Sequence, residues 1–404
     1  MPILYVHHRA EVSGAARSLA GLISSLDERW EAHVLTPNGP VARHFEAAGA
    51  RVVTAPVSLF QHTWDNPYAR RKWLLLAREA AALAPHVVAV ERVLRSRSFA
   101  LVHLNDSPLL AAAAAAHLHR LPVVWHLRSA LSPRGAVVPR LVRGSLERLG
   151  SAAIAIDRDV AESFALRLPT DVVFNSVTVP GDLLSTVEAK QRLGLPLDRV
   201  TVGFIGNIRM IKGWPELVGA AALLREAPVH FVVLGGGIRP PEFFRTRYGR
   251  TVSAIGLAAD DETAMRAAVA ARGLDERFTF LPFSDDVASV YPALDVVTFP
   301  NQGVGLGRPV LEAAAFGKPV VASGSPTGAG VLLPDRTGLL LERATPDLLA
   351  AALARLAHDE RLRKELGANG RQHAAKAFDA TGAARQVAAL YERVLNARRQ
   401  SSAR

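Results

Sequence analysis

Short apolar runs of strand length alternate with segments of helical pattern along the whole chain. Such runs lie at 2–6, 33–36 and 51–55, and the alternation resumes at 200–205. Because parallel strands are joined by crossover helices, this alternation is typical of a doubly wound parallel sheet. The pattern occurs in both halves of a chain of 404 residues, a length sufficient for two domains. The sequence therefore predicts two α/β domains.

The stretch 295–323 contains the most informative of these units. A buried apolar run is followed by a glycine-rich turn at 303–307, a helix at 309–316 and another strand. Glycines let a ligand approach the backbone closely, and a helix start offers unpaired N–H groups to an anion. Glu312 lies in an otherwise apolar helix with Arg308 just before it, which indicates a binding site. The competing interpretation is a solvated first-turn carboxylate that favours the helix dipole.

A second glycine turn follows the run 200–205. It contains Gly206, Arg209, Lys212 and Gly213. Two cations beside free backbone N–H groups suit a diphosphate, since arginine can donate two hydrogen bonds and lysine adds a point charge. The alternative is a pair of exposed cations on a loop.

Two positions in the first half follow strands in the same way. Gly14 lies in the turn between the first strand and the first helix, where either a ligand or a tight connection explains a glycine. His126 and Arg128 close the strand-like run 122–127, and the ligands of α/β sheets gather beyond the carboxyl ends of strands. A structural, hydrogen-bonded histidine is the competing interpretation of His126.

Several patterns that can indicate cofactors or metals are weak here. The glycines at 235–237 lack the G-x-G-x-x-G spacing of a dinucleotide site, and the segment 241–248 after them predicts one helix. Asp157 and Asp159 form a D-x-D pair, but Asp157 stands between a strand and a helix, where an N-cap is the simpler explanation. The chain contains no cysteine, which excludes disulfides, thiolate metal sites and cysteine nucleophiles.

The stretch 295–323 resembles the donor-binding segment of family-4 glycosyltransferases, the large retaining group with a GT-B fold. The residues that match the family's pattern here are Gly307, Arg308, Pro309, Glu312 and Ala313. Val304 stands where the family carries a glutamate. The turn 206–213 resembles the family's Gly-Arg-Leu…Lys-Gly motif, and the run 122–129 resembles the strand whose histidine faces the donor sugar.

The resemblance implies an α/β fold of the GT-B class, with two Rossmann-like doubly wound domains facing across a cleft. Residues 1–180 would form an acceptor-side domain and residues 181–380 a domain that binds the nucleotide sugar. Residues 381–404 would form a helix that crosses back to the first domain.

The resemblance also implies metal-independent glycosyl transfer with retention and without a cofactor. In that scheme Arg209 and Lys212 neutralise the diphosphate, Glu312 holds the ribose and His126 contacts the sugar. The expected donor-binding residues are Gly14, Gly206, Asn207, Gly235, Gly307, Arg308 and Glu312. Two alternatives stay open: a nucleotide-sugar epimerase on the same fold, and a non-catalytic nucleotide-sugar-binding homologue. The valine at position 304 favours the second alternative.

The net charge of +11 is the remaining global feature. Basic proteins attract nucleic acids, anionic membranes and phosphorylated ligands. Without interleaved aromatic residues or a recognition-helix motif, the arginines do not indicate nucleic acid. The expected partners are a nucleotide-sugar donor, a glycan or lipid-linked acceptor and an anionic membrane surface. Without a recognisable signal peptide or long apolar tract, the expected location is the cytoplasm, with a peripheral position at the inner membrane face as its variant.

Overall fold

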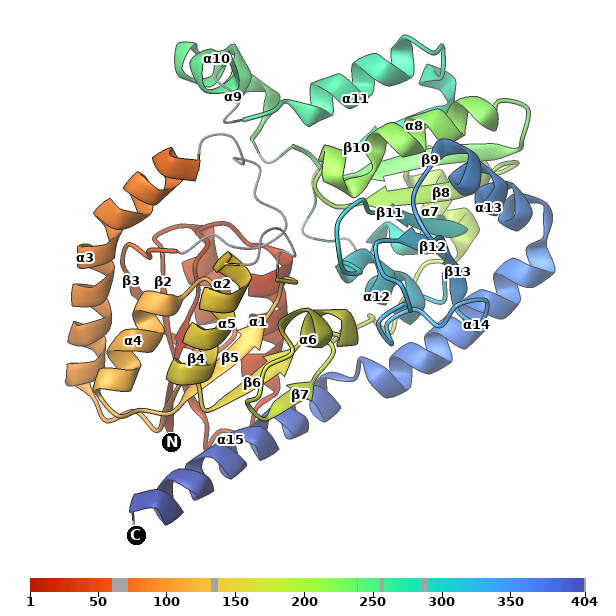
Figure 1. The fold of residues 1–404 in the computed structure, drawn as a ribbon. Helices are drawn as coiled ribbons and strands as arrows, with labels where there is room; N and C mark the ends of the chain where they lie inside the picture. The colour runs from red at the N-terminus through yellow and green to blue at the C-terminus, as the bar shows by residue number, and fades with distance from the viewer. Residues whose placement is uncertain are drawn as a thin grey trace. The chain divides into compact units, whose positions relative to one another are not determined.

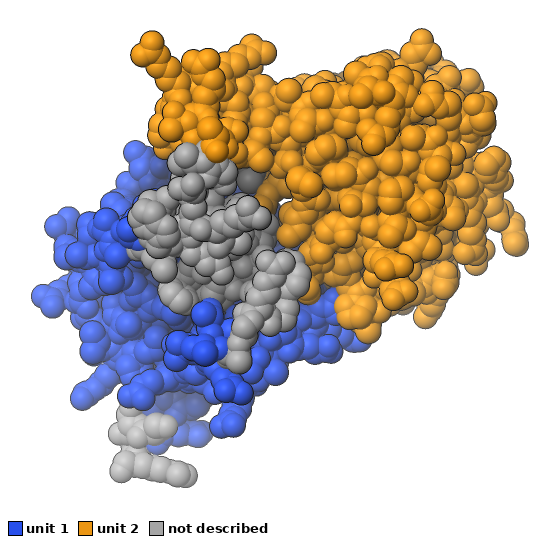
Figure 2. Space-filling model, turned by 45° about the horizontal axis from the view of Figure 1, so that its top comes forward, with its two compact units in different colours: residues 1–176, 379–404 blue, residues 177–378 orange. Residues whose placement is uncertain are grey.

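The computed structural model describes residues 1–59, 72–131, 137–237, 239–254, 258–282, 284, 286 and 289–402. The chain divides into two compact units. Unit 1 comprises Met1–Ser176 and Asp379–Arg404, and unit 2 comprises Val177–Phe378 (Figure 2). The last segment of the chain is therefore part of the first unit.

Among its described residues, unit 1 has a sheet of seven strands, all paired in parallel, in the order β3-β2-β1-β4-β5-β6-β7. The strands are β1 (Pro2–Val6), β2 (Glu31–Thr36), β3 (Arg51–Thr54), β4 (Leu101–Leu104), β5 (Val123–Leu127), β6 (Ala152–Ala155) and β7 (Thr170–Val172). Ile3 and Tyr5 of the central β1 pack into one apolar layer, and Leu4 and Val6 pack into the other. Burial on both faces explains why the sequence of β1 is a continuous run of apolar residues.

Helices cover both faces of this sheet (Figure 1). The layer beside Ile3 and Tyr5 is formed by α1 (Gly14–Ser25), α2 (Pro40–Ala47) and α15 (Ala380–Ser402). The opposite layer is formed by α3 (Lys72–Ser96), α4 (Leu110–Leu118), α5 (Val137–Leu149) and α6 (Arg158–Phe164). The carboxyl ends of β4 and β5 lie next to one another in the sheet and carry the polar residues described below.

The sheet described for unit 2 has six parallel strands in the order β10-β9-β8-β11-β12-β13. The strands are β8 (Val200–Ile205), β9 (Val229–Leu234), β10 (Phe278–Leu281), β11 (Val296–Pro300), β12 (Val320–Ser323) and β13 (Gly338–Leu340). Its helices are α7 (Thr186–Arg192), α8 (Trp214–Leu223), α9 (Pro241–Arg245), α10 (Arg247–Ala254), α11 (Asp261–Ala270), α12 (Arg308–Ala315), α13 (Pro346–His358) and α14 (Glu360–Ala377). One face packs against α8, α11 and α13. The α12 helix packs against α14.

The predicted pair of doubly wound α/β units is confirmed by these two parallel sheets. The single helix predicted over 241–248 is wrong, because the chain breaks at Thr246, whose backbone is extended. The Thr246 hydroxyl accepts a hydrogen bond from Gly249 N at 2.9 Å and so caps the start of α10. Gly249 lies so close to Phe243 that a Cβ would stand 1.9 Å from the Phe243 carbonyl oxygen. A capping threonine and a close-packed glycine thus divide the segment into two helices.

Candidate functional site

The two glycine turns of unit 2 meet at the point where the strand order reverses. From β8 the chain runs outward to β9 and β10, and then returns to place β11 on the other side of β8. In open α/β sheets, ligands bind beyond the carboxyl ends of the strands at such a reversal. The turn 206–213 follows β8 and the turn 303–307 follows β11, so both lie at this edge.

The loops after β8 and β9 approach one another closely because two glycines allow it. Gly206 has φ +124° and Gly235 has φ +141°, which is backbone geometry that side chains disfavour. A Cβ on Gly235 would lie 2.1 Å from the Gly206 carbonyl oxygen. The amide of Ile208 donates to the Gly236 carbonyl at 3.0 Å. Gly235 is thus required for this close packing, and Gly206 is required for its positive φ. Asn207, which follows Gly206, is exposed.

The cationic turn also packs against the end of β11. Gly213, at φ +80°, lies so close to Pro300 that a Cβ would stand 1.8 Å from its carbonyl oxygen. The amide of Gln302 donates to the Ile211 carbonyl at 2.8 Å. Lys212 Nζ lies 5.0 Å from the centre of the Phe299 ring, within the range of a cation–π interaction. The lysine is therefore held over β11, and Arg209, like Lys212, is half-buried.

Phe299 connects this turn to the start of α12. A Cβ on Gly307, the residue before α12, would lie 2.8 Å from the Phe299 ring, so a larger residue would require this ring to shift. Gly305 has φ +94°, and its amide donates to the Gly324 carbonyl at 2.6 Å. Glycines thus bring the backbone of the 303–307 turn and the start of α12 to the same ring that faces Lys212.

Glu312 is buried, with a relative exposure of 6%. Its Oε1 accepts a hydrogen bond from Arg308 Nε at 3.0 Å, and its Oε2 accepts one from Tyr291 Oη at 2.8 Å. Burial, followed by the nearby Glu312 carboxylate, raises the pKa of Tyr291 well above its usual value, so Tyr291 remains a hydrogen-bond donor. The interpretation of Glu312 as a solvated first-turn residue is therefore wrong. Its contact with a ribose stays a prediction.

Val304 is an exposed apolar residue in the same turn, with 41% of its surface accessible. Its side chain cannot accept a hydrogen bond. The neighbouring Asn301 is buried, and its Nδ2 donates to the Gly305 carbonyl at 3.0 Å. Asn301 was missed by sequence reasoning, because nothing local to it shows that its amide holds the turn.

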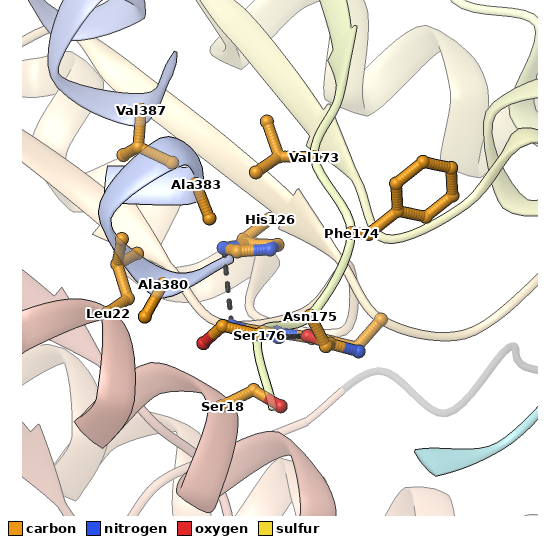
Figure 3. Close-up of a pocket in the computed structure, with 11 residues that line it drawn as sticks. Ser18, Leu22, His126, Val173, Phe174, Asn175, Ser176, Ala380, Ala383 and Val387 are labelled. Carbon is orange, nitrogen blue, oxygen red and sulfur yellow. Dashed lines mark hydrogen bonds between the residues drawn. The ribbon is translucent and has the colours of Figure 1, made fainter. Parts of the chain in front are cut away.

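In unit 1, His126 lines a small pocket between α1, α15 and the segment after β7 (Figure 3). Its Nδ1 lies 3.1 Å from His103 Nε2 and 3.3 Å from Arg128 Nη2. Its Nε2 is buried without a hydrogen-bond partner among the described residues. Burial, followed by Arg128 and His103, lowers the pKa of His126 well below its usual value. His126 is thus neutral at physiological pH. The other residues that line the pocket are Ser18, Leu22, Arg128, Val173, Phe174, Asn175, Ser176, Ala380, Ala383 and Val387.

Arg128 holds the polar groups at the strand ends together. Its Nε donates to Asn105 Oδ1 at 2.8 Å, and its Nη1 donates to Asn175 Oδ1 at 2.5 Å. Asn105 in turn contacts His7 Nδ1 at 2.8 Å through its Nδ2. Asn105 and His7 were not among the predicted site residues, although both follow buried strands, which is the signal that could have indicated them.

Gly14 is exposed and is the first residue of α1. Ser13 caps this helix by accepting from Ala16 N at 3.3 Å, and Ser18 Oγ donates to the Gly14 carbonyl at 2.9 Å. Residues 7–13 separate β1 from α1, so this connection is not a tight turn. A donor contact of Gly14 stays a prediction. Gly14 and His126 belong to unit 1, whereas the other predicted site residues belong to unit 2.

Asp157 is the N-cap of α6, and its Oδ1 accepts from Val160 N at 2.7 Å. Burial is the main cause that raises the pKa of Asp157 to about 6. Among the residues that the structure describes, no three or more acidic or histidine side chains are grouped so that they could hold a metal ion. The hydrogen bond from Val160 N confirms Asp157 as an N-cap.

Comparison with known proteins gives two family matches that together span most of the chain. Residues 185–373 match the family described as glycosyl transferases group 1, and residues 13–202 match the glycosyl transferase 4-like domain. A 2-deoxystreptamine glucosyltransferase of Streptomyces kanamyceticus is 30% identical over 410 residues, which cover 97% of this chain and 89% of that protein.

Other relatives match over a shorter length. A D-inositol 3-phosphate glycosyltransferase of Corynebacterium urealyticum is 30% identical over 220 residues, which cover 52% of this chain and 47% of that protein. The chain thus spans about half the length of this relative and of several others with the same name.

Among solved structures, Anabaena Alr3699/HepE in complex with UDP-glucose has a TM-score of 0.77 at 21% identity, covering 97% of this chain and 99% of that one. This likeness concerns the fold, and it confirms the predicted GT-B class with two Rossmann-like units. The full-length match to a glucosyltransferase and the family match over 185–373 establish the family. The chain belongs to the glycosyl transferases group 1.

Proposed function

We propose that this protein transfers a glycosyl unit from a nucleotide-sugar donor to an acceptor hydroxyl, with retention at the anomeric carbon and without a metal ion. The observation that carries this proposal is that the Lys212 turn and the start of α12 lie side by side where the strand order of unit 2 reverses. Lys212 lies 5.0 Å from the Phe299 ring, and Gly307 at the start of α12 packs against the same ring. A diphosphate at this edge would meet cations and the N–H groups of a helix start together.

The proposed reaction needs no protein nucleophile. The bond between the anomeric carbon and the diphosphate oxygen breaks, and the acceptor oxygen bonds to that carbon. The acceptor's proton passes to the leaving phosphate oxygen, so the products are a glycoside and a nucleoside diphosphate. Arg209 and Lys212 would stabilise the negative charge that develops on the leaving group.

Glu312 and His126 complete the proposed donor contacts. Glu312 already accepts from Arg308 and Tyr291, but a carboxylate has about four lone-pair sites, so ribose hydroxyls can still donate to it. His126 is neutral and has a ring nitrogen without a hydrogen-bond partner in the described part of the chain, which suits a contact to a sugar oxygen.

The donor and acceptor are proposed from the relatives. HepE was solved with UDP-glucose, and two relatives are named for 2-deoxystreptamine and for D-inositol 3-phosphate. We therefore propose a uridine nucleotide sugar as the first donor to test, and a polyhydroxylated ring compound as the first acceptor.

The test is incubation with UDP-glucose and each of these two compounds in the presence of EDTA, followed by NMR of the anomeric proton in the product. The expected product forms in EDTA and keeps the anomeric configuration of the donor. Loss of turnover in EDTA, or an inverted product, would contradict the metal-independent retaining reaction. Conversion of the donor without any acceptor would indicate an epimerase instead.

A binding protein without turnover is the second candidate, and Val304 favours it. Val304 is exposed, and its side chain cannot accept the hydrogen bonds that the glutamate of family-4 glycosyltransferases can accept at this position. Tight donor binding with no product from any acceptor would support this candidate.

We also propose peripheral contact with an anionic membrane. Among the described residues, no helix is long and apolar enough to span a bilayer. However, α5 exposes Val137, Val138 and Leu141 next to Arg140, and the chain carries a net charge of +11. Exposed apolar residues beside cations favour binding at the interface of a membrane with anionic lipids.

A further inference from the structure

The proton positions on His126 follow from the groups that surround its ring. Arg128 Nη2 lies 3.3 Å from His126 Nδ1. A guanidinium can only donate, so Nδ1 must accept a hydrogen bond there. A neutral imidazole carries one N–H group, and an accepting Nδ1 leaves the proton on Nε2. Nε2 is the ring nitrogen without a partner among the described residues, in the pocket that His126 lines.

A second chain of contacts leads to the same nitrogen. His103 Nε2 lies 3.1 Å from His126 Nδ1, so His103 must donate from Nε2, and its own Nδ1 must accept. Tyr391 of α15 lies 2.6 Å from His103 Nδ1 and is the group that can donate to it. The hydroxyl of Tyr5 lies 3.4 Å from that of Tyr391, which makes it the longer and weaker contact of the chain.

The side chains that form this series of hydrogen bonds are buried. Tyr5, His103 and Tyr391 have 0% exposure, and His126 has 4%. Burial, followed by Arg128, lowers the pKa of His103 to about 3, so His103 is neutral and can hold only one ring proton. Tyr391 Oη lies 2.6 Å from His103 Nδ1 and 3.4 Å from Tyr5 Oη, so His103 Nδ1 is its closer acceptor. Arg128 at one end and Tyr391 at the other thus favour the same proton positions on the two histidines.

We propose that Tyr391, acting through His103 and together with Arg128, is a positioning residue that holds His126 as the neutral Nε2–H tautomer, so that His126 meets its ligand as a hydrogen-bond donor. The ligand atom that this group recognises is an oxygen acceptor, such as a sugar hydroxyl or carbonyl oxygen. The inference rests on the proposed function, in which His126 contacts the donor sugar, and it adds that His126 donates the hydrogen bond in this contact.

His7 provides an internal comparison. Its Nδ1 lies 2.8 Å from Asn105 Nδ2, whose orientation is set by the bond from Arg128 Nε to Asn105 Oδ1. His7 is thus held as the Nε2–H tautomer through Arg128, by a route that does not include Tyr391.

The test is ¹⁵N NMR of the histidine rings in the full-length protein at neutral pH, without any ligand. His126, His103 and His7 are assigned from His→Gln variants. In the wild-type protein we expect a pyrrole-type Nε2 and a pyridine-type Nδ1 for each of the three rings. A charged His126, or a proton on its Nδ1, would overturn the proposal.

The variant Tyr391→Phe removes only the hydroxyl. The ratio of the two His126 tautomers should then shift by roughly three- to tenfold, as expected for the loss of one neutral hydrogen bond. Tyr5→Phe is the matched control, because it removes the same atom from the same buried cluster but leaves the donor to His103 in place. The His7 signals should not change in either variant.

Identical His126 tautomer ratios in wild type and Tyr391→Phe would contradict the role of Tyr391, even if both proteins fold equally well. Because no donor is present, this result is independent of the proposed glycosyl transfer. If the transfer assay fails, the tautomer measurement still tests the role of Tyr391.

Discussion

At the scale of single residues, Arg209 and Lys212 carry the proposed diphosphate site. We predict that Arg209→Ala and Lys212→Ala each weaken the binding of UDP by about 1.5–3 kcal/mol, the contribution of a hydrogen bond to a charged group. Isothermal titration calorimetry measures this loss. Lys364→Ala is the control, since Lys364 lies on the same unit with 77% of its side chain exposed in a surface ion pair. Unchanged affinity in both site variants would place the diphosphate elsewhere.

Val304 lies in the turn before α12, which we propose to contact the donor sugar. Because it is 41% exposed, a glutamate fits there without disturbing the core. We predict that Val304→Glu changes the order of preference among nucleotide sugars, since a carboxylate accepts hydrogen bonds that a valine cannot. Competition assays with a panel of donors measure the order, and Val304→Ile is the apolar control. The same order in Val304→Glu as in wild type would mean that position 304 does not face the sugar.

At the scale of elements, the N-cap of α6 makes stability depend on pH. Burial raises the pKa of Asp157 to about 6, above the value of an unfolded aspartate. The folded state therefore binds this proton more tightly, and its contribution to stability is present below the unfolded pKa and lost as the pH rises through 6.

Asp157→Asn keeps a capping side chain but cannot ionise. We predict that the free energy of unfolding of wild type, relative to Asp157→Asn, decreases by about 2–3 kcal/mol between pH 4 and pH 7. Urea titrations at several pH values measure this difference. A difference that is constant with pH, or that grows as the pH rises, would show that Asp157 is not protonated more readily in the folded state.

The proposed membrane contact can be tested by substitution of an exposed residue of α5. Leu141 is 64% exposed on it, beside Arg140. We predict that Leu141→Asp reduces binding to vesicles of anionic phospholipid, and that binding of the wild type falls steeply with added salt. Co-sedimentation measures both effects. Leu118→Asp is the control, because Leu118 is 79% exposed at the end of α4, in the same unit. Equal losses in both variants, or no binding by the wild type, would contradict a contact through α5.

At the scale of the whole molecule, the first unit depends on the last helix. Ala384, Val387, Leu390, Tyr391 and Val394 of α15 are buried in the layer that contains Ile3 and Tyr5 of β1. Removing residues 379–404 would expose this layer, and each large apolar side chain accounts for about 1.5–3 kcal/mol of burial.

We predict that the chain truncated after Phe378 loses protease resistance in unit 1 while unit 2 stays protected. Limited proteolysis with mass spectrometry distinguishes the two units. Truncation after Asn396 is the control, since residues 397–400 are exposed. A protected unit 1 in the shorter chain would show that α15 is dispensable for its fold.

The class of fold and the positions of the turns could be predicted from local patterns in the amino-acid sequence. Strand and helix periods are local, so the alternation from 2–6 onward and the glycines at 206, 235 and 307 could be interpreted without knowing their neighbours. In the structure Gly235 packs against the Gly206 carbonyl and Gly307 packs against the Phe299 ring, while Gly206 has a positive φ.

Which side chains act together could not be predicted, because their contacts form only when distant segments pack. Glu312 was expected in a site, but its partner Tyr291 comes from a different element, 21 residues earlier. The contact between His103 and Tyr391 joins residues 288 positions apart and requires the last helix to return to the first sheet. No local pattern records such a pairing, because periodicity reports which face of an element is buried, whereas hydrogen-bond direction depends on the groups that folding brings to that face.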